Sequence, residues 1–362
     1  MAHNNLALIF MKGCEHFGEQ VEYYLNQWEE PDASLVIQAE CPRFADGEGK
    51  GVVYESVRGK DIFIVADPFN YSVTYKMYGT LNHMSPDDHF QDVKRIISAI
   101  GGKARRITVI LPRLYGGRQD RRNLRESLDC AHALQELGRM GVAGVVTFDA
   151  HEPRVQNAIP LTGFDNFMPK YQMLKALLRQ YQDVVLHKDG MVMIAPDPGA
   201  ANRCISYADT LGLDMGLFYK RRNFQTVVGG ENPIAQHVYI GDRLDGKDAV
   251  IVDDMVASGA SLLDTFRAMR REGAKRSFAF ITFGVFSSGF DVFDEAYRDG
   301  LFEKIFVTNL VYNPPELIAR PWASIVDMTK YAAYIIAAIH HDDSVAALID
   351  PEQKIAALLS QK

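Results

Sequence analysis

The stretch AVIVDDMVASGASL, residues 249–262, decides the fold, because it predicts a buried strand that leads into two carboxylates and a loop of small residues. Residues 250–252 form the apolar, β-branched run typical of a strand covered on both faces. Asp253 and Asp254 follow at the edge where ligands bind in open α/β sheets. Apolar residues then recur at helical spacing over 262–271. We therefore expect a strand, a ligand-facing edge and a helix in that order.

The loop between the two expected elements suits an anion. It consists of Ser258, Gly259, Ala260 and Ser261. Small side chains let backbone N–H groups approach an anion closely at a helix N-terminus, where the helix dipole favours negative charge. Taken alone, the same residues would also fit a solvated acidic turn followed by an ordinary helix cap.

The complete string resembles the phosphoribosyl pyrophosphate binding motif shared by type I phosphoribosyltransferases and ribose-phosphate diphosphokinases. The resemblance implies that residues 258–261 hold the 5-phosphate of ribose 5-phosphate and that Asp253 and Asp254 face its hydroxyls. Other segments resemble the diphosphokinase family, in the family's order and over nearly the whole chain. They are FADGE (44–48), YESVRGKDIFIV (54–65), RLYGGRQDRR (113–122), VTFDAHEPRVQNAI (146–159), APDPGAANR (195–203) and YKRR (219–222).

Two of these segments are expected to bind ATP. Arg118 and Gln119 follow a strand predicted at 107–111, and a guanidinium there can hold phosphate or stack on a purine. A charged loop of this kind is by itself more often solvated, whereas the resemblance assigns both residues to ATP. It also implies that the adenine side is lined by Phe44, Asp46 and Glu48, with the Phe44 ring as a stacking face.

The resemblance further implies a magnesium nucleotide held near His151 and Asp197. A lone histidine after a strand is usually structural, and only the family match assigns His151 to the metal. Mg²⁺ prefers oxygen ligands and keeps several waters, so one carboxylate together with substrate oxygens is a suitable shell. The implied diphosphate loop consists of Asp197, Pro198, Gly199 and Ala200.

The basic run at 219–222 resembles the start of the family's mobile catalytic loop. Without that context it would be a solvated surface. The resemblance implies that Lys220 and Arg222 act with His151 in transferring the β,γ-diphosphoryl group of ATP to the anomeric hydroxyl of ribose 5-phosphate. Such chemistry needs in-line positioning and cations rather than a protein nucleophile.

Departures from the family keep two alternatives open, a non-catalytic regulatory homologue and a phosphoribosyltransferase. Ala257 stands where the family's loop usually carries an acid, and Ala260 and Ser261 stand where glycine and threonine are usual. The aromatic-rich segment 69–92 is longer than the family's. The ATP-site residues argue against the transferase, and the basic run with His151 argues against the regulatory homologue.

Strands and helices alternate along the chain, which predicts an α/β fold with mostly parallel sheets flanked by helices. The predicted strands are LALIFM (6–11), DIFIVA (61–66), ITVILP (107–112), GVVTFD (144–149), VMIAPD (192–197), MGLFY (215–219), AVIVDD (249–254), FAFITF (278–283) and IFVTN (305–309). We predict two phosphoribosyltransferase-like domains, 1–165 and 166–345, followed by a tail, 346–362. The halves look similar, but no residue-level repeat is evident. The resemblance suggests that a helix at 331–340 packs near the first domain.

Composition narrows the function classes. The net charge of −7 argues against a general nucleic-acid binder, and no apolar run approaches the about 20 residues that a membrane helix needs. Four cysteines without paired spacing, and no signal-peptide pattern, predict a cytoplasmic protein. The family suggests a homo-oligomer built from dimers, with a hexamer as one form.

Overall fold

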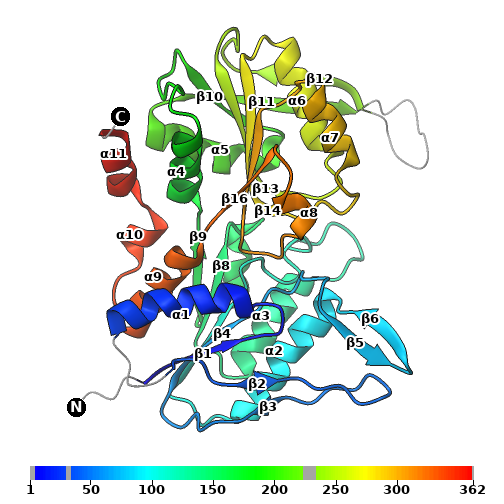
Figure 1. The fold of residues 1–362 in the computed structure, drawn as a ribbon, viewed down its shortest axis with the longest axis vertical. Coiled ribbons are helices and arrows are strands. Elements are labelled where there is room, and N and C mark those ends of the chain that lie inside the picture. Colours follow the sequence, from blue (N-terminus) through cyan, green and yellow to red (C-terminus); the bar gives the residue numbers. More distant parts are fainter. Residues whose placement is uncertain (1–4, 30–33, 223–233, 361–362) are drawn as a thin grey trace. The chain divides into compact units, whose positions relative to one another are not determined.

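The computed structural model describes residues 5–29, 34–222 and 234–360, except for the side chains of 220–237. It forms two compact units (Figure 1). Unit 1 comprises Met1–Pro169, Asn309–Tyr312 and Asp327–Asp350, and unit 2 comprises Lys170–Thr308, Asn313–Val326 and Pro351–Lys362. Each unit has its own mostly parallel sheet with helices on both faces, which confirms the predicted fold class. Across the described residues, no helix is both long and apolar enough to cross a membrane.

Unit 1 is built on a five-stranded parallel sheet. Its strands, in spatial order, are β1 (Leu6–Phe10), β4 (Asp61–Val65), β7 (Arg106–Ile110), β8 (Gly144–Phe148) and β9 (Gly163–Phe167). Its helices are α1 (Glu15–Glu29), α2 (Pro86–Ile100), α3 (Asp129–Arg139), α9 (Thr329–His340) and α10 (Ala346–Ile349), with a 3₁₀ turn at Pro153–Ala158. Two small antiparallel pairs lie outside the sheet, namely β2 (Ala39–Glu40) with β3 (Val52–Val53), and β5 (Thr74–Met77) with β6 (Thr80–His83).

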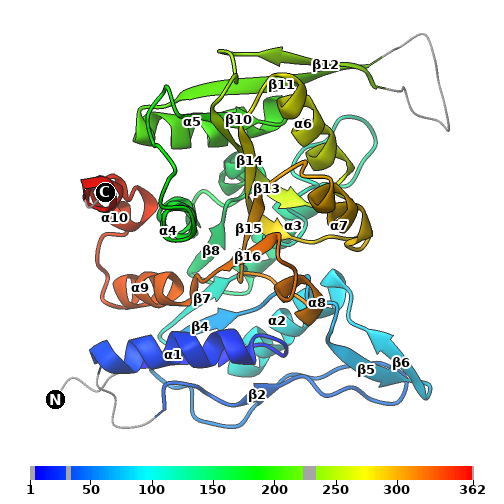
Figure 2. The same cartoon turned by 45° about the horizontal axis from the view of Figure 1, so that its top comes forward.

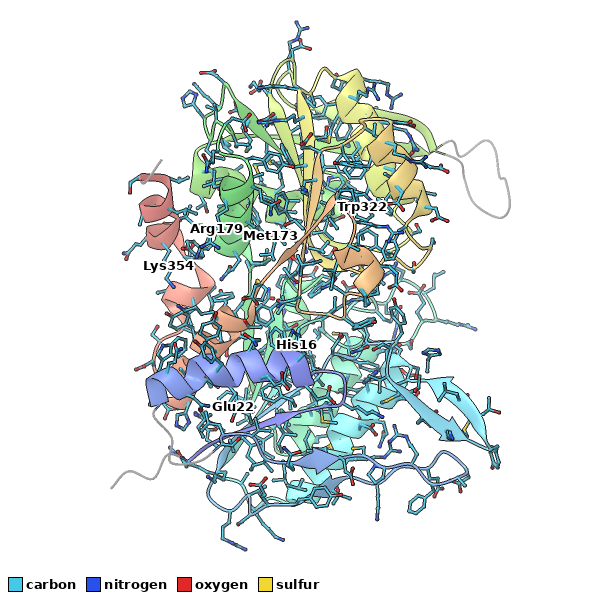
Figure 3. The ribbon with its side chains drawn as sticks, viewed as in Figure 1. His16, Glu22, Met173, Arg179, Trp322 and Lys354 are labelled. Carbon is cyan, nitrogen blue, oxygen red and sulfur yellow. The ribbon has the colours of Figure 1, made fainter. Side chains whose placement is uncertain are left out.

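Unit 2 has a seven-stranded sheet. The spatial order is β12 (Ile234–Ile240), β11 (Asp214–Arg222), β10 (Met191–Ala195), β13 (Asp248–Val256), β14 (Arg276–Gly284), β15 (Lys304–Thr308) and β16 (Ala323–Val326), and only β12 is antiparallel to its neighbour. Helices α4 (Lys170–Gln180) and α5 (Ala201–Leu211) lie on one side, and α6 (Ala260–Arg271) and α7 (Asp291–Arg298) lie on the other (Figures 1 and 2). The remaining helices are α8 (Pro315–Ile318), α11 (Glu352–Ser360) and a 3₁₀ turn at Pro198–Ala200. Trp322, labelled in Figure 3, is fully buried in this core.

Helix α9 belongs to unit 1, as the resemblance suggested, although the predicted range 166–345 assigned it to the second domain. Tyr331 of α9 packs on Phe148 and Phe167 of the first sheet, with ring centroids 6.1 and 6.0 Å apart. Trp28 of α1 stacks on Tyr334 at 4.4 Å. The ranges 1–165, 166–345 and 346–362 therefore differ from the observed units, because the apolar face of α9 covers the first sheet and the chain then returns to unit 2 for α11.

The two sheets contain a residue-level repeat that the sequence analysis did not recognise. GKDIFIVAD (59–67) leads into and through β4, and GKDAVIVDD (246–254) does the same for β13. Gly59 and Gly246 both have φ of +73°, a conformation that favours glycine. The strand orders β1-β4-β7-β8-β9 and β10-β13-β14-β15-β16 correspond one to one. Asp67 of unit 1 therefore occupies the position of Asp254 in unit 2.

The repeat includes an ion pair between a buried aspartate at the start of one strand and an arginine at the start of the next, β4 to β7 in unit 1 and β13 to β14 in unit 2. In unit 1, Arg106 donates from Nε and Nη2 to the Asp61 carboxylate at 2.8 and 2.6 Å. In unit 2, Arg276 donates to Asp248 at 2.9 and 2.6 Å. Arg106 also donates to the Ile339 carbonyl at 2.7 Å. The pair in unit 1 therefore fastens the end of α9 to the sheet.

Asp67 makes the stability of unit 1 sensitive to pH. Its carboxylate accepts from the backbone N–H groups of Phe69 and Tyr312 at 2.9 and 2.7 Å, yet burial raises its pKa to about 6. Because the unfolded pKa is about 3.9, the native state binds the proton more tightly and the free energy of unfolding falls as pH rises from about 4 to 6.

We expect Asp67→Asn, which resembles the protonated acid, to remove this fall. Urea unfolding of wild type and variant across that pH range measures it. Asp343→Asn, at an exposed position, serves as the control and should leave the slope unchanged. Parallel pH profiles for wild type and Asp67→Asn would contradict the assignment.

Candidate functional site

The carboxyl edge of β13 is the centre of the candidate site in unit 2. The strand was predicted over 249–254 with the two acids at its end, but β13 continues to Val256, so two strand residues follow Asp254. On one side β14 pairs with β13 up to Val256, whereas on the other side the pairing with β10 stops at Ile251. The two acids therefore lie beside the loop that follows β10, and they point to opposite faces of the sheet.

Asp253 is the more accessible of the two acids. Its side chain is 29% exposed, and its Oδ1 lies 3.7 Å from Nη1 of Arg203, whose side chain is 9% exposed. Burial, followed by the charge of Asp254, raises the pKa of Asp253 well above its usual range, and Asp197 acts in the same direction. A cation or a hydroxyl donor bound here would relieve this unfavourable negative charge. Arg203 on α5 had no role in the sequence analysis, although it lies in the recognised APDPGAANR segment.

The predicted diphosphate loop is closed by its own aspartate. Oδ1 of Asp197 accepts from the N–H groups of Gly199 and Ala200 at 2.8 and 3.3 Å and so caps the 3₁₀ turn that starts at Pro198. These N–H groups belong to the loop that the resemblance predicts to bind diphosphate. In this conformation the loop orients the Asp197 carboxylate, and an anion would have to displace it from those donors.

The small-residue loop leads into α6, but the helix begins at Ala260 and not at the predicted Leu262, so Ala260 and Ser261 lie in its first turn. Gly259 is the N-cap, with φ of +85°, and a Cβ on it would lie 2.2 Å from Cζ of Phe293. Because glycine has no side chain, the N-cap offers no side-chain acceptor to the first-turn N–H groups, which an anion can use. Ser258, Ala260 and Ser261 are exposed. The start of α6 therefore lacks a side-chain cap and is flanked by exposed small residues.

The residues predicted to bind ATP lie in unit 1, and one of them, Gln119, makes hydrogen bonds within its own loop. Arg118 is exposed. The side-chain amide of Gln119 donates to the carbonyls of Ser127 and Arg121 at 2.9 and 3.3 Å, so its NH₂ holds the basic loop together.

The FADGE segment forms a tight turn in unit 1. The N–H of Phe44 donates to the Glu48 carbonyl at 2.7 Å, and that of Gly47 donates to the Phe44 carbonyl at 3.0 Å. Phe44 is 54% exposed, and Asp46 and Glu48 are exposed as well. The turn therefore presents an aromatic ring and two acids to solvent.

His151 follows β8 at the carboxyl edge of the first sheet and is exposed. Asp149, two residues before it, has φ of +40°, a strained conformation for a non-glycine residue. The backbone N–H of Asp149 donates to the Phe167 carbonyl, and the residue is buried, which together hold this conformation. Within the described part of the chain, no three histidine, cysteine or acidic side chains lie close enough together to hold a metal ion.

Lys220 and Arg222 lie in the last residues of β11, where the backbone pairs with β12. The resemblance predicts a loop that begins there, but the strand continues to Arg222 because β12 pairs with it. The side chains of both residues lie outside the described part, and their catalytic role stays a prediction.

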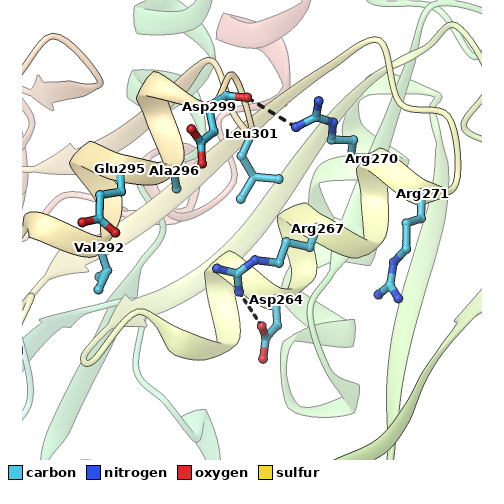
Figure 4. A pocket seen from close by; sticks show the side chains of 9 residues that line it. All are labelled: Asp264, Arg267, Arg270, Arg271, Val292, Glu295, Ala296, Asp299 and Leu301. Atoms are coloured by element: carbon cyan, nitrogen blue, oxygen red, sulfur yellow. Dashed lines mark hydrogen bonds and ion pairs between the residues drawn. The ribbon is translucent and has the colours of Figure 1, made fainter.

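A groove elsewhere on unit 2 contains none of the predicted site residues. Figure 4 shows its walls, α6 and α7, with Arg267 donating to Asp264 at 2.7 Å and Arg270 donating to the Asp299 carbonyl at 3.3 Å. Three arginines and three acids line the groove, so its formal charges balance: Arg267, Arg270, Arg271, Asp264, Glu295 and Asp299. The candidate site is therefore the β13 edge and not this groove.

Comparison with known families places three models along the chain. Residues 6–141 match the N-terminal domain of ribose phosphate pyrophosphokinase, residues 171–285 match a phosphoribosyl transferase domain, and residues 231–350 match a phosphoribosyl synthetase-associated domain. Together they include the second sheet with the β13 edge, and strands β1, β4 and β7 of the first sheet.

Curated proteins and a solved structure similar to this chain carry names that agree with these family models. The ribose-phosphate pyrophosphokinase of Vibrio parahaemolyticus is 28% identical over 316 residues, which cover 86% of this chain and 91% of that protein. Ribose-phosphate pyrophosphokinase 2 of Schizosaccharomyces pombe is 28% identical over 309 residues, 84% of this chain and 87% of that protein. The crystal structure of phosphoribosylpyrophosphate synthetase from Mycobacterium smegmatis shares the fold, with a TM-score of 0.76 at 22% identity, over 93% of this chain and 99% of that one.

Proposed function

The chain belongs to the ribose-phosphate pyrophosphokinase family, and from this premise we propose that it transfers the diphosphoryl group of ATP to the anomeric hydroxyl of ribose 5-phosphate with the help of Mg²⁺. The products are then phosphoribosyl pyrophosphate and AMP. The observation that carries the proposal is the β13 edge, where Asp253 is accessible beside the glycine-capped start of α6.

The edge suits ribose 5-phosphate in two ways. The sugar hydroxyls can donate to the Asp253 carboxylate, whose pKa is raised by burial and then by the charge of Asp254. The 5-phosphate can accept from the first-turn N–H groups of α6 and from the hydroxyls of Ser258 and Ser261. Asp254 is buried.

Mg²⁺ fits the donor set at this edge. Burial and the charges of Asp254 and Asp197 raise the pKa of Asp253, so a cation beside it would be favourable, and Mg²⁺ prefers oxygen ligands of this kind, completed by waters and substrate oxygens. We propose Asp197 and His151 as its protein-side contacts. When bound, Mg²⁺ would neutralise charge on the transferred phosphates.

The proposed chemistry needs few protein groups. The anomeric oxygen forms a bond to the β-phosphorus of ATP, the bond from that phosphorus to the oxygen bridging to the α-phosphate breaks, AMP leaves with that oxygen, and the hydroxyl proton is released. Arg118 and Gln119 would hold ATP, with Phe44, Asp46 and Glu48 around its base. We propose that Lys220 and Arg222 meet the charge on the moving diphosphoryl group.

Incubation with ribose 5-phosphate, Mg²⁺ and ATP, with AMP and phosphoribosyl pyrophosphate scored together, tests the proposal. Absence of AMP would favour a non-catalytic regulatory homologue, for which Ala257 and the self-capped Asp197 loop are arguments. Consumption of phosphoribosyl pyrophosphate that requires a nucleobase would favour a phosphoribosyltransferase. A dimer-based homo-oligomer is part of the proposal, and light scattering of the purified protein measures it.

Substitutions on the two sides of the site should separate the substrates. Arg118→Ala should raise the Kd for ATP by about 10- to 100-fold, the size expected for a lost charged hydrogen bond, with the KM for ribose 5-phosphate unchanged. Ser261→Ala should raise the KM for ribose 5-phosphate by about 5- to 10-fold and spare ATP. Calorimetry and steady-state rates measure both. Arg125→Ala, an exposed arginine in the same basic loop, is the control, and a reversed pattern would contradict the assignment.

A further inference from the structure

The β5–β6 hairpin fills a position in unit 1 that a short loop fills in unit 2. In the internal repeat, β4 and α2 correspond to β13 and α6. Only residues 257–259 connect the latter pair, whereas residues 66–85 connect the former and include the hairpin. Figures 1 and 2 show it beside the loop that joins β2 to β3, which contains the turn 44–48. The long segment that departs from the family is therefore an ordered element.

The base of the hairpin is rigidly held. Asn70 is 2% exposed, and its side chain donates to the Gly13 carbonyl at 3.1 Å and accepts from the N–H of Ser72 at 3.0 Å. The N–H of Met84 donates to the Val73 carbonyl at 2.8 Å, which closes the two strands. The hairpin thus leaves the sheet in a fixed direction.

The tip of the hairpin contacts the turn 44–48. The N–H of Tyr78 donates to the Ala45 carbonyl at 2.8 Å. A Cβ on Gly47 would lie 2.7 Å from the sulfur of Met77, so the Met77 side chain packs directly on that glycine. The turn is supported on one side by Met77 and Tyr78.

A second contact supports the chain just before the turn. The Arg43 guanidinium lies 5.1 Å from the centre of the Tyr75 ring, and it donates to both carboxylate oxygens of Asp92 at 2.8 and 2.9 Å. Tyr75 and Met77 are two residues apart on β5 and so share one face of the hairpin. That face is turned to the segment 43–47, while Phe44, Asp46 and Glu48 stay exposed.

We propose that the β5–β6 hairpin is a positioning element of the nucleotide site, in which Met77 and Tyr78 hold the turn 44–48 in the shape that receives the purine. The inference rests on the proposed role of Phe44, Asp46 and Glu48 at adenine. A turn ordered before binding avoids the cost of ordering its side chains on the ligand, and loss of the support should appear in nucleotide affinity.

The test replaces the contact between Met77 and Gly47. Met77→Ala should raise the KM and the calorimetric Kd for ATP by about tenfold, which corresponds to the ordering of one or two side chains. The kcat and the KM for ribose 5-phosphate should stay within about twofold, and Met77→Leu should restore ATP binding, since it keeps the volume. Leu81→Ala, an exposed β6 residue paired with Lys76 on the other face, is the matched control and should leave all constants unchanged.

Phe44→Ala distinguishes failure of the inference from failure of its premise. If Phe44→Ala weakens ATP binding and Met77→Ala does not, the positioning role is overturned and the proposed function stands. If neither variant changes ATP binding, the turn is not the adenine site and the inference falls with that assignment. Equal losses in kcat and both KM values, with a lower Tm, would mean that Met77 acts only on folding and would overturn the positioning role.

Discussion

Replacing Gly259 by alanine is expected to lower kcat/KM for ribose 5-phosphate by about 10²-fold or more, because the phosphate loop cannot keep its shape. The residue has φ of +85°, and its Cβ would lie 2.2 and 2.5 Å from two atoms of the Phe293 ring. Phe293 is fully buried, so the loop backbone has to move away from α7. The N–H groups at the start of α6 would then miss the 5-phosphate. Steady-state kinetics and a calorimetric titration with ribose 5-phosphate measure the loss.

Gly289→Ala is a matched control for this substitution. Gly289 has a similar φ of +78°, but no atom lies within 4 Å of its Cβ position. It should cost about 1 kcal/mol of stability through backbone strain and leave the kinetics intact. If Gly259→Ala proves unstable, adding Phe293→Leu makes room, and partial recovery of binding is expected. Near-normal kcat/KM in folded Gly259→Ala would refute the loop assignment.

Replacing Arg106 by alanine is expected to destabilise the protein by about 3–5 kcal/mol, because it strands a buried carboxylate. The Asp61 side chain is 1% exposed and loses two of its hydrogen bonds, although His340 stays at 2.8 Å. The Ile339 carbonyl loses its donor as well. Urea unfolding measures the loss, and hydrogen exchange should show it first at the end of α9.

Arg267→Ala is the comparison, since it breaks an exposed pair with Asp264 and should change stability by about 0.5 kcal/mol or less.

The pH dependence of stability supplies an independent check on the role of Arg106. The Arg106 guanidinium and His340 hold the pKa of Asp61 below its usual range, so the pair stabilises the fold above about pH 4 and its contribution is lost as acid protonates Asp61. Arg106→Ala should flatten that acid loss. A second change, Asp61→Ala, should recover part of the stability, and failure to do so would argue against a stranded charge.

Local patterns predicted the main strands because a buried parallel strand is an uninterrupted apolar run. The runs at 61–66 and 249–254 appear as β4 and β13. They did not predict that β13 would continue past its two acids to Val256, since that depends on pairing with β14, a distant segment. The repeat of GKDIFIVAD in GKDAVIVDD is not evident from the sequence alone, because many buried strands share similar apolar residues. Only four of the nine positions are identical polar or glycine residues, which is too few to recognise without the shared strand register.

In the candidate site, too, the features that depend on contacts between distant segments could not be predicted from the sequence. Asp253 and the loop 258–261 could be predicted because one contiguous motif carries them. The capping of the turn at 198–200 by Asp197 and the closeness of Arg203 to Asp253 depend on how α5 packs. The hairpin at 74–83 was not predicted, because its turn residues, Tyr78 and Gly79, lack the asparagine that usually marks such a turn.

The late return of α9 to unit 1 has a consequence for synthesis on the ribosome. The strands of the first sheet are complete once Phe167 has been made, but Tyr331, which covers Phe148 and Phe167, is translated more than 160 residues later. Until then the nascent chain carries an uncovered aromatic face, the kind of surface on which unfinished chains associate. The amino-terminal half therefore has to wait for the carboxyl-terminal end of the chain, and a ribosome that stalls before Thr329 would release a product prone to aggregation.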